Sequence, residues 1–167
     1  MNDIDIMTEL VECSRADVPI ELFIRGICCL RPGVPGCTET VTVRSVVARH
    51  LEHSRIFVFG TGADAKIYIG SGDLLNRNTR RRVEAFIEVR TPETREQVLE
   101  VMEAFRCDSE RGRVMLADGS YTQEGRGVKG TDSQDRLYEY FVRQTIDAPA
   151  EEPKKKGLFG FLHRKKK

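Results

Sequence analysis

The 167-residue sequence contains no tryptophan, only three histidines and no apolar run longer than four residues. A membrane-spanning helix needs about 20 apolar residues, so no segment fits one. Residues Met1–Asp5 lack the basic and apolar regions of a secretory signal, and we therefore expect a cytoplasmic protein. Hydrophobic residues make up 40% and charged residues 32%, which indicates a globular chain long enough for one domain.

The cysteines argue against disulfides and against a metal centre. There are five, an odd number, and no two are spaced as a Cys-x-x-Cys pair. The adjacent Cys28 and Cys29 would point to opposite faces of a strand, so one metal ion could not easily hold both. We expect free thiols in a reducing compartment and no metal site formed by this chain.

The charges nearly cancel but are unevenly distributed. Lys and Arg number 27 against 26 Asp and Glu, yet seven of the basic residues lie in 154–167. Residues 1–153 therefore hold 20 basic and 26 acidic residues, a formal charge of −6. We expect residues 1–147 to form the folded domain and residues 148–167 to be a linker and a disordered basic tail. Contact of this tail with an anionic membrane at its inner face is one interpretation, and a solubilising end is the other.

Hydrophobic periodicity predicts strands that alternate with helices. Asp3 or Asp5 is the expected N-cap of the first helix, and Thr91 that of the clearest one. Helices are expected at residues 5–16, 44–52, 91–105 and 132–146, and strands at residues 20–25, 55–59, 66–70, 83–89 and 114–116. This order predicts an α/β layered fold in which helices flank a mixed β-sheet.

Arg25 and His53 are the first candidate functional residues. Arg25 closes a predicted strand and precedes a glycine, and ligands of α/β proteins bind at such strand ends. Its guanidinium could hold a phosphate group, although a surface ion pair with a carboxylate is the plainer alternative. His53 follows the helix predicted at 44–52, where it could interact with the helix dipole. It could equally donate a proton or contact a phosphate group.

The turn Gly70–Asp73 is a candidate anion site. It follows a predicted strand, and Asp73 stands where it could cap a following helix. Arg77, Arg80, Arg81 and Arg82 come directly after it. A basic cluster is usually a solvated face, but beside such a turn it favours phosphorylated or polyanionic ligands.

Six segments of the chain occur in the order and spacing of a known family. They are Phe23–Cys28, Leu30–Gly36, Leu51–Arg55, Ile67–Asp73, Arg77–Asn78 and Arg82–Glu84. Together they resemble the C-terminal domain of bacterial polyphosphate kinase, the type that works through a phosphohistidine. The resemblance covers residues 7–145 and leaves out the basic tail.

The resemblance implies a fold, a reaction and three site residues. The fold would be phospholipase D-like, the second of two related halves that meet at the active site. The enzyme would transfer the terminal phosphate of ATP reversibly onto polyphosphate with Mg²⁺. Arg25 matches a nucleotide-phosphate-binding arginine, His53 the second active-site histidine and proposed general acid, and Arg82 a basic residue that lines the same pocket.

Two departures from the pattern limit what this chain could do alone. The phosphorylated histidine of the family lies in a preceding domain, so we expect the isolated chain to be inactive and the upstream domains to be its partners. Phospholipase D-like enzymes use His-x-Lys-x4-Asp, whereas Arg55 and Gly60 stand at the Lys and Asp positions here. This argues against a dimeric nuclease, the third interpretation. The main alternative is a non-catalytic module that binds polyphosphate or nucleic acid, and a homodimer is a further candidate assembly.

Overall fold

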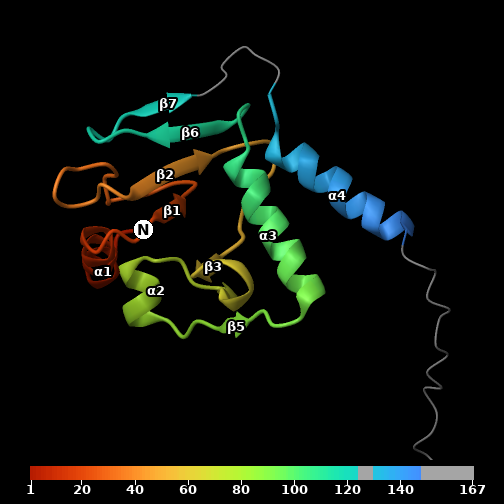
Figure 1. Ribbon diagram of the computed structural model, residues 1–167, viewed down its shortest axis with the longest axis horizontal. Coiled ribbons are helices and arrows are strands. Elements are labelled where there is room, and N and C mark those ends of the chain that lie inside the picture. The colour runs from red at the N-terminus through yellow and green to blue at the C-terminus, as the bar shows by residue number, and fades with distance from the viewer. Residues whose placement is uncertain (124–129, 148–167) are drawn as a thin grey trace, which may run out of the picture.

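Alternating burial along β2 (Val41–Val46) explains why this segment is a strand at the centre of a sheet. Val41, Val43 and Ser45 are buried, while Thr42 between them is exposed. The computed structural model describes residues 1–123 and 130–147, and Figure 1 shows their arrangement. The sheet has the order β1-β2-β6-β7, in which β1 and β2 are parallel and the other pairs antiparallel. Its other strands are β1 (Ile20–Phe23), β6 (Gly112–Met115) and β7 (Tyr121–Gln123).

A second sheet contains the strands predicted at 55–59 and 66–70, which form a hairpin. It is antiparallel, with the order β3-β4-β5, and its strands are β3 (Ile56–Phe59), β4 (Lys66–Gly70) and β5 (Phe86–Glu88). A short 3₁₀ helix, η1 (Gly62–Asp64), forms the connection between β3 and β4. Gly60 turns the chain after β3 with a φ of 86°, a conformation that favours glycine. The third strand is shorter than the predicted range of 83–89.

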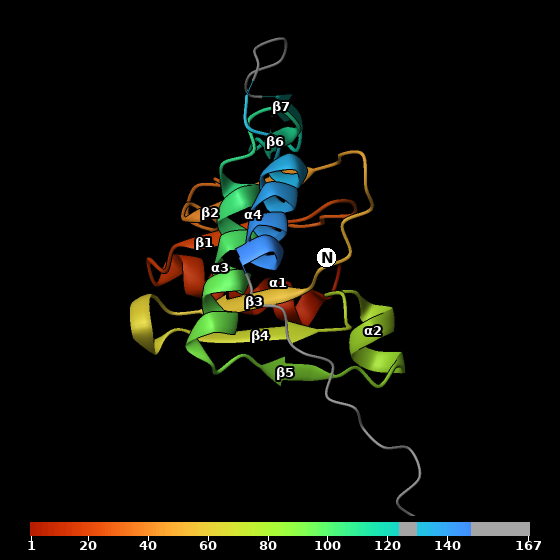
Figure 2. The same ribbon diagram turned by 90° about the vertical axis from the view of Figure 1, so that its right-hand side faces the viewer.

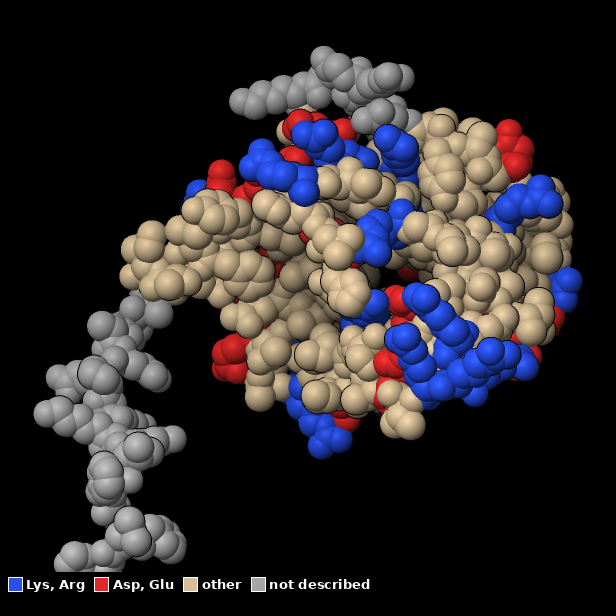
Figure 3. Space-filling model, turned by 180° about the vertical axis from the view of Figure 1, so that it is seen from behind, with Lys and Arg blue, Asp and Glu red and all other residues tan. Residues whose placement is uncertain are grey.

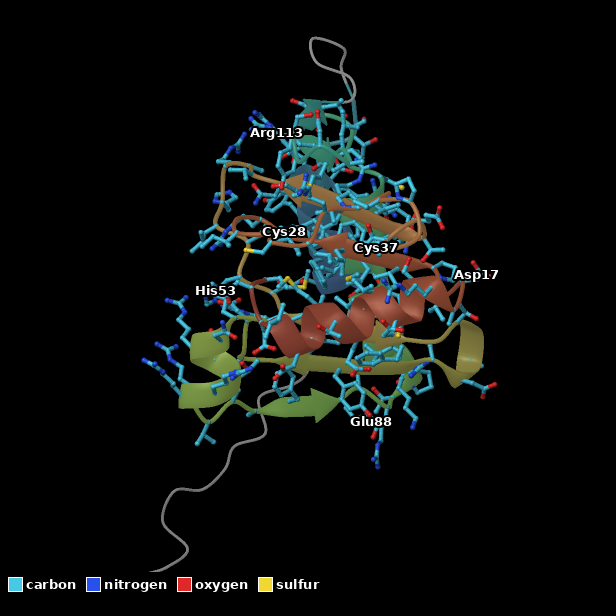
Figure 4. The ribbon with its side chains drawn as sticks, turned by 90° about the vertical axis from the view of Figure 1, so that its left-hand side faces the viewer. Asp17, Cys28, Cys37, His53, Glu88 and Arg113 are labelled. Carbon is cyan, nitrogen blue, oxygen red and sulfur yellow. The ribbon has the colours of Figure 1, made fainter. Side chains whose placement is uncertain are left out.

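The helices lie on opposite sides of the strands. Figure 2 shows α3 and α4 in front of them, whereas Figure 4, from the other side, shows α1 in front. The helices are α1 (Ile4–Arg15), α2 (Asn76–Arg81), α3 (Pro92–Arg106) and α4 (Ser133–Asp147). The predicted α/β class, with helices flanking a mixed sheet, is confirmed. The strands divide between two sheets, of which the first is mixed.

The main core lies between α1 and the four-stranded sheet. Apolar residues of α1, β1 and β2 pack there because the helix and the sheet each present one apolar face. Its buried members are Met1, Leu30, Val41, Val43 and Met115. Side chains that pack against them include Met7, Leu10, Val11, Ile20, Leu22 and Ile24. The apolar side chains Met7, Leu10 and Val11 of the helix predicted at 5–16 therefore face this core.

Asp3 caps α1 and joins it to α2. Its Oδ1 accepts hydrogen bonds from the backbone N–H groups of Asp5 and Ile6, each at 3.1 Å. Its Oδ2 accepts from the hydroxyl of Thr79 and lies 3.9 Å from Nε of Arg80. The hydrogen bond from Thr79 first, then that from Ile6 and the charge of Arg80, lower the pKa of the Asp3 carboxyl. The ionised form is thus favoured in the folded protein.

We expect Asp3→Asn to melt at a lower temperature than the unchanged chain at pH 7. Because the pKa of Asp3 is lower in the folded state, its charge stabilises the fold above the ordinary value of 3.8. That contribution is lost as the pH falls through the folded-state pKa. The difference in melting temperature, followed by circular dichroism, should therefore shrink between pH 5 and pH 3. Glu9→Gln, at an exposed position of the same helix, is the control, and a difference that is independent of pH would contradict the assignment.

The helix predicted at 44–52 is wrong. Residues 44–46 belong to β2, and residues 47–55 form an irregular segment between β2 and β3. The prediction relied on Val46, Val47 and Leu51 as a helical stripe, but Val47 and Leu51 are exposed, Leu51 by 73%. Pairing of β2 with β1 on one edge and β6 on the other determines the conformation instead.

The predicted tail, residues 148–167, lies outside the described residues, so the boundary after residue 147 stays a prediction. Within the described ranges, no helix is long and apolar enough to cross a membrane. The five cysteines are free thiols.

Candidate functional site

The candidate site lies at the edge where the parallel strands β1 and β2 end. Parallel neighbours bring their carboxyl ends to the same edge of a sheet. Arg25 follows β1 by two residues, and residues 47–55 leave β2 at the same edge. The hydroxyl of Ser45 donates to the carbonyl of Arg25 at 3.1 Å, which joins the two chain segments. The strand pairing thus places Arg25 beside the segment that carries His53.

Arg25 contacts this segment directly. Its guanidinium donates a hydrogen bond to the backbone carbonyl of Glu52, the residue before His53. The side chain is exposed, and no carboxylate among the described residues forms an ion pair with it. The alternative of a surface ion pair is therefore not what the structure shows. The guanidinium retains N–H groups that can face an anion.

His53 is exposed on the irregular segment 47–55, on the side of the molecule that carries α2 (Figure 4). Because no helix precedes it, the interpretation of His53 as a partner of a helix dipole is wrong. Its backbone carbonyl accepts a hydrogen bond of 2.6 Å from Arg55. Among the described residues, none forms a hydrogen bond with the imidazole itself.

Arg55 and Asp73 form an ion pair beneath this segment. Nε of Arg55 lies 3.0 Å from Oδ1 of Asp73, and the Arg55 side chain is only 14% exposed. Nη2 of Arg77 lies 3.9 Å from Oδ2 of Asp73. Partial burial alone would raise the pKa of Asp73, but Arg55, Arg77 and the nearby His53 together lower it. The sequence prediction missed this pair, for which the only local signal is the basic residue two positions after His53.

The Gly/Ser turn after β4 is occupied by a carboxylate of the chain itself. The N-cap of α2 is Leu75, so the prediction that Asp73 caps this helix is wrong. The N–H groups of Gly70 and Ser71 already donate to the carbonyls of Arg55 and Ala85, at 3.0 and 3.1 Å. A vacant anion site at Gly70–Asp73 is therefore not what the structure shows.

Glu84 provides that carboxylate. It accepts hydrogen bonds from the hydroxyl of Ser71 and, at 2.7 Å, from the amide of Asn78. These bonds lower its pKa, and the charges of Arg82 and Arg55 act in the same direction. Arg55 and Arg82 thus approach the same carboxylate from different segments of the chain.

The basic cluster on α2 is only partly neutralised. Arg77 pairs with Asp73, and Arg80 lies 2.8 Å from Asp5. Within the described ranges, Arg81 and Arg82 have no ion-pair partner. From behind, Figure 3 shows Lys and Arg side chains gathered at the lower right, the position of α2, beside a hollow. A cavity of about 640 Å³ between α1 and α2 is lined by Arg77, Arg80 and Arg81 together with Asn2, Ile4, Ile27, Leu75 and Asn76.

The three predicted site residues therefore lie around one network, but they do not all touch. Arg25 contacts the segment 47–55, which contains His53, and Arg55 connects that segment to Asp73. The charge of Arg82 acts on Glu84, without a direct contact to Arg25 or His53 among the described residues. No group of three or more Asp, Glu, His or Cys residues suited to a metal ion occurs in the part of the chain that the structure describes.

Comparisons with known proteins identify the family of the chain. Residues 1–134 match the family model described as polyphosphate kinase C-terminal domain 2. A polyphosphate kinase of Lactiplantibacillus plantarum is 38% identical over 149 residues, which cover 89% of this chain and 20% of that protein. A polyphosphate kinase of Thermosynechococcus vestitus is 42% identical over 137 residues, 80% of this chain and 19% of that protein.

A solved structure shows the same fold. The crystal structure of polyphosphate kinase from Porphyromonas gingivalis superposes with a TM-score of 0.82 at 28% identity, over 89% of this chain and 23% of that one. The chain spans about a fifth of the length of the curated relatives that it matches. The motifs, the fold and these matches agree, and the chain belongs to the polyphosphate kinase C-terminal domain 2 family.

Proposed function

We propose that the chain supplies the ATP- and polyphosphate-binding half of a polyphosphate kinase active site. The reaction would transfer the terminal phosphate of ATP reversibly onto a polyphosphate chain. The observation that carries the proposal is the placement of Arg25 and His53 on one edge, both exposed, with Arg25 bound to the residue before His53. Arg82 approaches the same network with no ion-pair partner among the described residues.

These three side chains suit phosphoryl transfer. The transferred group carries negative charge on its oxygens, so the protein must provide positioned cations rather than a nucleophile on this half. Arg25 would bind a nucleotide phosphate, and Arg82 would neutralise charge on the other side of the pocket. His53 would donate a hydrogen bond or a proton to the leaving oxygen. Side chains of opposite halves would then enclose the phosphate between them.

Mg²⁺ and the partners also belong to this proposal. Three carboxylates lie near the site and each is already held by other side chains, Asp73 by Arg55, Glu84 by Ser71 and Asn78, and Glu52 by Gln134. They do not fit an Mg²⁺ ligand set, so we assign Mg²⁺ to the ATP phosphates in the complete enzyme. The upstream polyphosphate kinase domains are the proposed partners, with a homodimer as a further assembly. We also propose a phospholipase D-like fold, a cytoplasmic location and contact of the basic tail with anionic lipid.

A non-catalytic polyanion-binding module is the second candidate. The observation that favours it is the exposed α2 cluster, in which Arg81 and Arg82 lack ion-pair partners within the described ranges. Such a module would bind polyphosphate or nucleic acid with an affinity that falls steeply with salt. A phospholipase D-like nuclease has less support, because Gly60, at the position of the signature Asp, carries no carboxylate.

The test uses ATP labelled at the γ-phosphate and the 167-residue chain, alone and mixed with the upstream domains of a relative. We expect no label on the isolated chain, because this half needs no covalent acceptor, and labelled polyphosphate in the mixture. Label retained on a histidine of the isolated chain would contradict the division of roles. A mixture that binds polyphosphate but forms none would favour the non-catalytic module.

A further inference from the structure

Gln134, in the first turn of α4, uses its whole side-chain amide on the segment that carries His53. Nε2 donates to the backbone carbonyl of His50 at 2.8 Å and to Oε1 of Glu52 at 2.7 Å. Oε1 accepts from the backbone N–H of His50 at 2.9 Å. Both N–H bonds and the carbonyl oxygen of this amide are therefore committed to residues 50 and 52, more than 80 positions away in the sequence.

Such contacts matter because residues 47–55 have no regular structure of their own. A segment without helix or strand hydrogen bonds is positioned by what binds it from outside. Arg25 binds the carbonyl of Glu52 and Arg55 binds the carbonyl of His53. Gln134 binds the side chain of Glu52, whereas Arg25 binds its backbone carbonyl. The residue before His53 is therefore held by two separate side chains.

Gln134 is itself held in place. Its backbone N–H donates to Oδ1 of Asp132 at 2.9 Å, which caps the start of α4. The next N–H toward the N-terminus, that of Ser133, donates to the buried carboxylate of Asp108 at 2.9 Å. The amide thus projects from a fixed helix end rather than from a mobile surface, as a positioning group requires.

We propose that Gln134 is a positioning residue that holds the segment 47–55 so that His53 faces the bound phosphate. This inference rests on the proposed function of His53. The role calls for an amide, because the group must donate twice and accept once at the same place. A glutamate at position 134 could not donate to the His50 carbonyl, and it would bring a second carboxylate against Glu52.

The experiment follows the imidazole resonances of His53 by NMR while inorganic tripolyphosphate is added to the 167-residue chain. His53→Ala identifies the signals. We expect a tripolyphosphate-dependent shift in the unchanged chain, and a half-saturation concentration raised on the order of 10-fold in Gln134→Glu, because a small displacement of a binding group has a large effect. Glu52→Gln added to Gln134→Glu should restore part of this loss, because it removes the repulsion and returns a donor to the contact.

Gln144→Glu is the matched control, because it adds the same negative charge to the same helix. Gln144 lies on the same helix and accepts a hydrogen bond of 3.0 Å from Gln97 of α3, away from the segment 47–55. Its response to tripolyphosphate should equal that of the unchanged chain. If Gln134→Glu also responds like the unchanged chain, the positioning role is wrong while the proposed function stands. If the unchanged chain shows no shift at His53, the proposed phosphate contact fails, and the inference fails with it.

Discussion

Replacing His53 with alanine is expected to lower kcat of the reconstituted kinase by about 10²- to 10⁴-fold, the range that a positioned proton donor contributes. The KM for ATP should change much less, because Arg25 still supplies a phosphate-binding guanidinium at the same edge. The measurement is polyphosphate formation by this chain mixed with the upstream domains, at saturating ATP.

The effect is expected to be large because the ion-paired side chains beside His53 cannot take its place. The neighbouring side chains of the network, Arg55 and Asp73, are engaged with each other. Arginine also stays protonated at neutral pH, so it cannot act as a proton donor to the leaving oxygen. In the proposed mechanism, His53 would contribute a proton or a hydrogen bond, whereas Arg25 and Arg82 would contribute electrostatic stabilisation.

His50→Ala provides the control for this prediction. His50 lies three residues earlier on the same segment and is also exposed, and its contacts to Gln134 run through its backbone N–H and carbonyl. An alanine at position 50 keeps both, so kcat should stay within about twofold, as at surface positions away from specific contacts. Equal losses in the two variants would indicate disturbance of the segment rather than a role for the imidazole. Activity of His53→Ala close to that of the unchanged chain would reject the assignment.

Elements with strong local signals were predictable from the sequence. The helix after Thr91 begins with Pro92 at its first position, and its pattern needs no distant partner. The hairpin of β3 and β4 is similarly local. The segment 44–52 was mispredicted because valine and leucine positions fit a helix and a strand equally well. Only the pairing with β1 and β6, which are distant in the sequence, decides between them.

The candidate site divides in the same way. Arg25, His53 and Arg82 stand in recognisable motifs, so the sequence could nominate them, and their roles stay predictions. The side chains that arrange them could not be found, because each acts across a long sequence separation. Arg55 binds Asp73, 18 positions away, and Gln134 binds Glu52, 82 positions away. A lone glutamine at a helix start carries no pattern that predicts such a contact.

Asp108→Ala is expected to lower the free energy of unfolding by about 3 kcal/mol or more, because three backbone N–H groups lose a buried acceptor and each unsatisfied group costs about 1–3 kcal/mol. Asp108 is 0% exposed. Its Oδ1 accepts from the backbone N–H groups of Arg111 and Gly112, at 2.6 and 2.9 Å, and its Oδ2 accepts from that of Ser133 at 2.9 Å. The carboxylate therefore joins the end of α3, the start of β6 and the start of α4.

Two further variants separate this role from a general effect of losing an aspartate. Asp108→Asn keeps one acceptor oxygen but replaces the other with a donor. Its free energy of unfolding should therefore fall less than that of Asp108→Ala, but still by about 1–3 kcal/mol. Asp118→Ala removes a carboxylate that binds the N–H and hydroxyl of Ser120 in an exposed turn, and its loss should be much smaller. Urea unfolding followed by circular dichroism measures all three. A point substitution ordinarily changes the free energy of unfolding by about 1 kcal/mol. If Asp108→Ala lowers it by no more than that, the structural role of Asp108 is contradicted.

Because of where Asp108 lies, we expect its loss to affect the candidate site as well as the stability of the fold. Ser133, which it holds, directly precedes Gln134, and Gln134 holds the segment that carries His53. One of the N–H groups freed in Asp108→Ala, that of Ser133, lies where α4 begins, so that helix end should loosen before the three-stranded sheet unfolds. Hydrogen exchange at Ser133 and Gln134 should therefore accelerate more in Asp108→Ala than exchange in β3 and β4. Uniform acceleration throughout the chain would instead indicate that α4 and the sheets open as one unit.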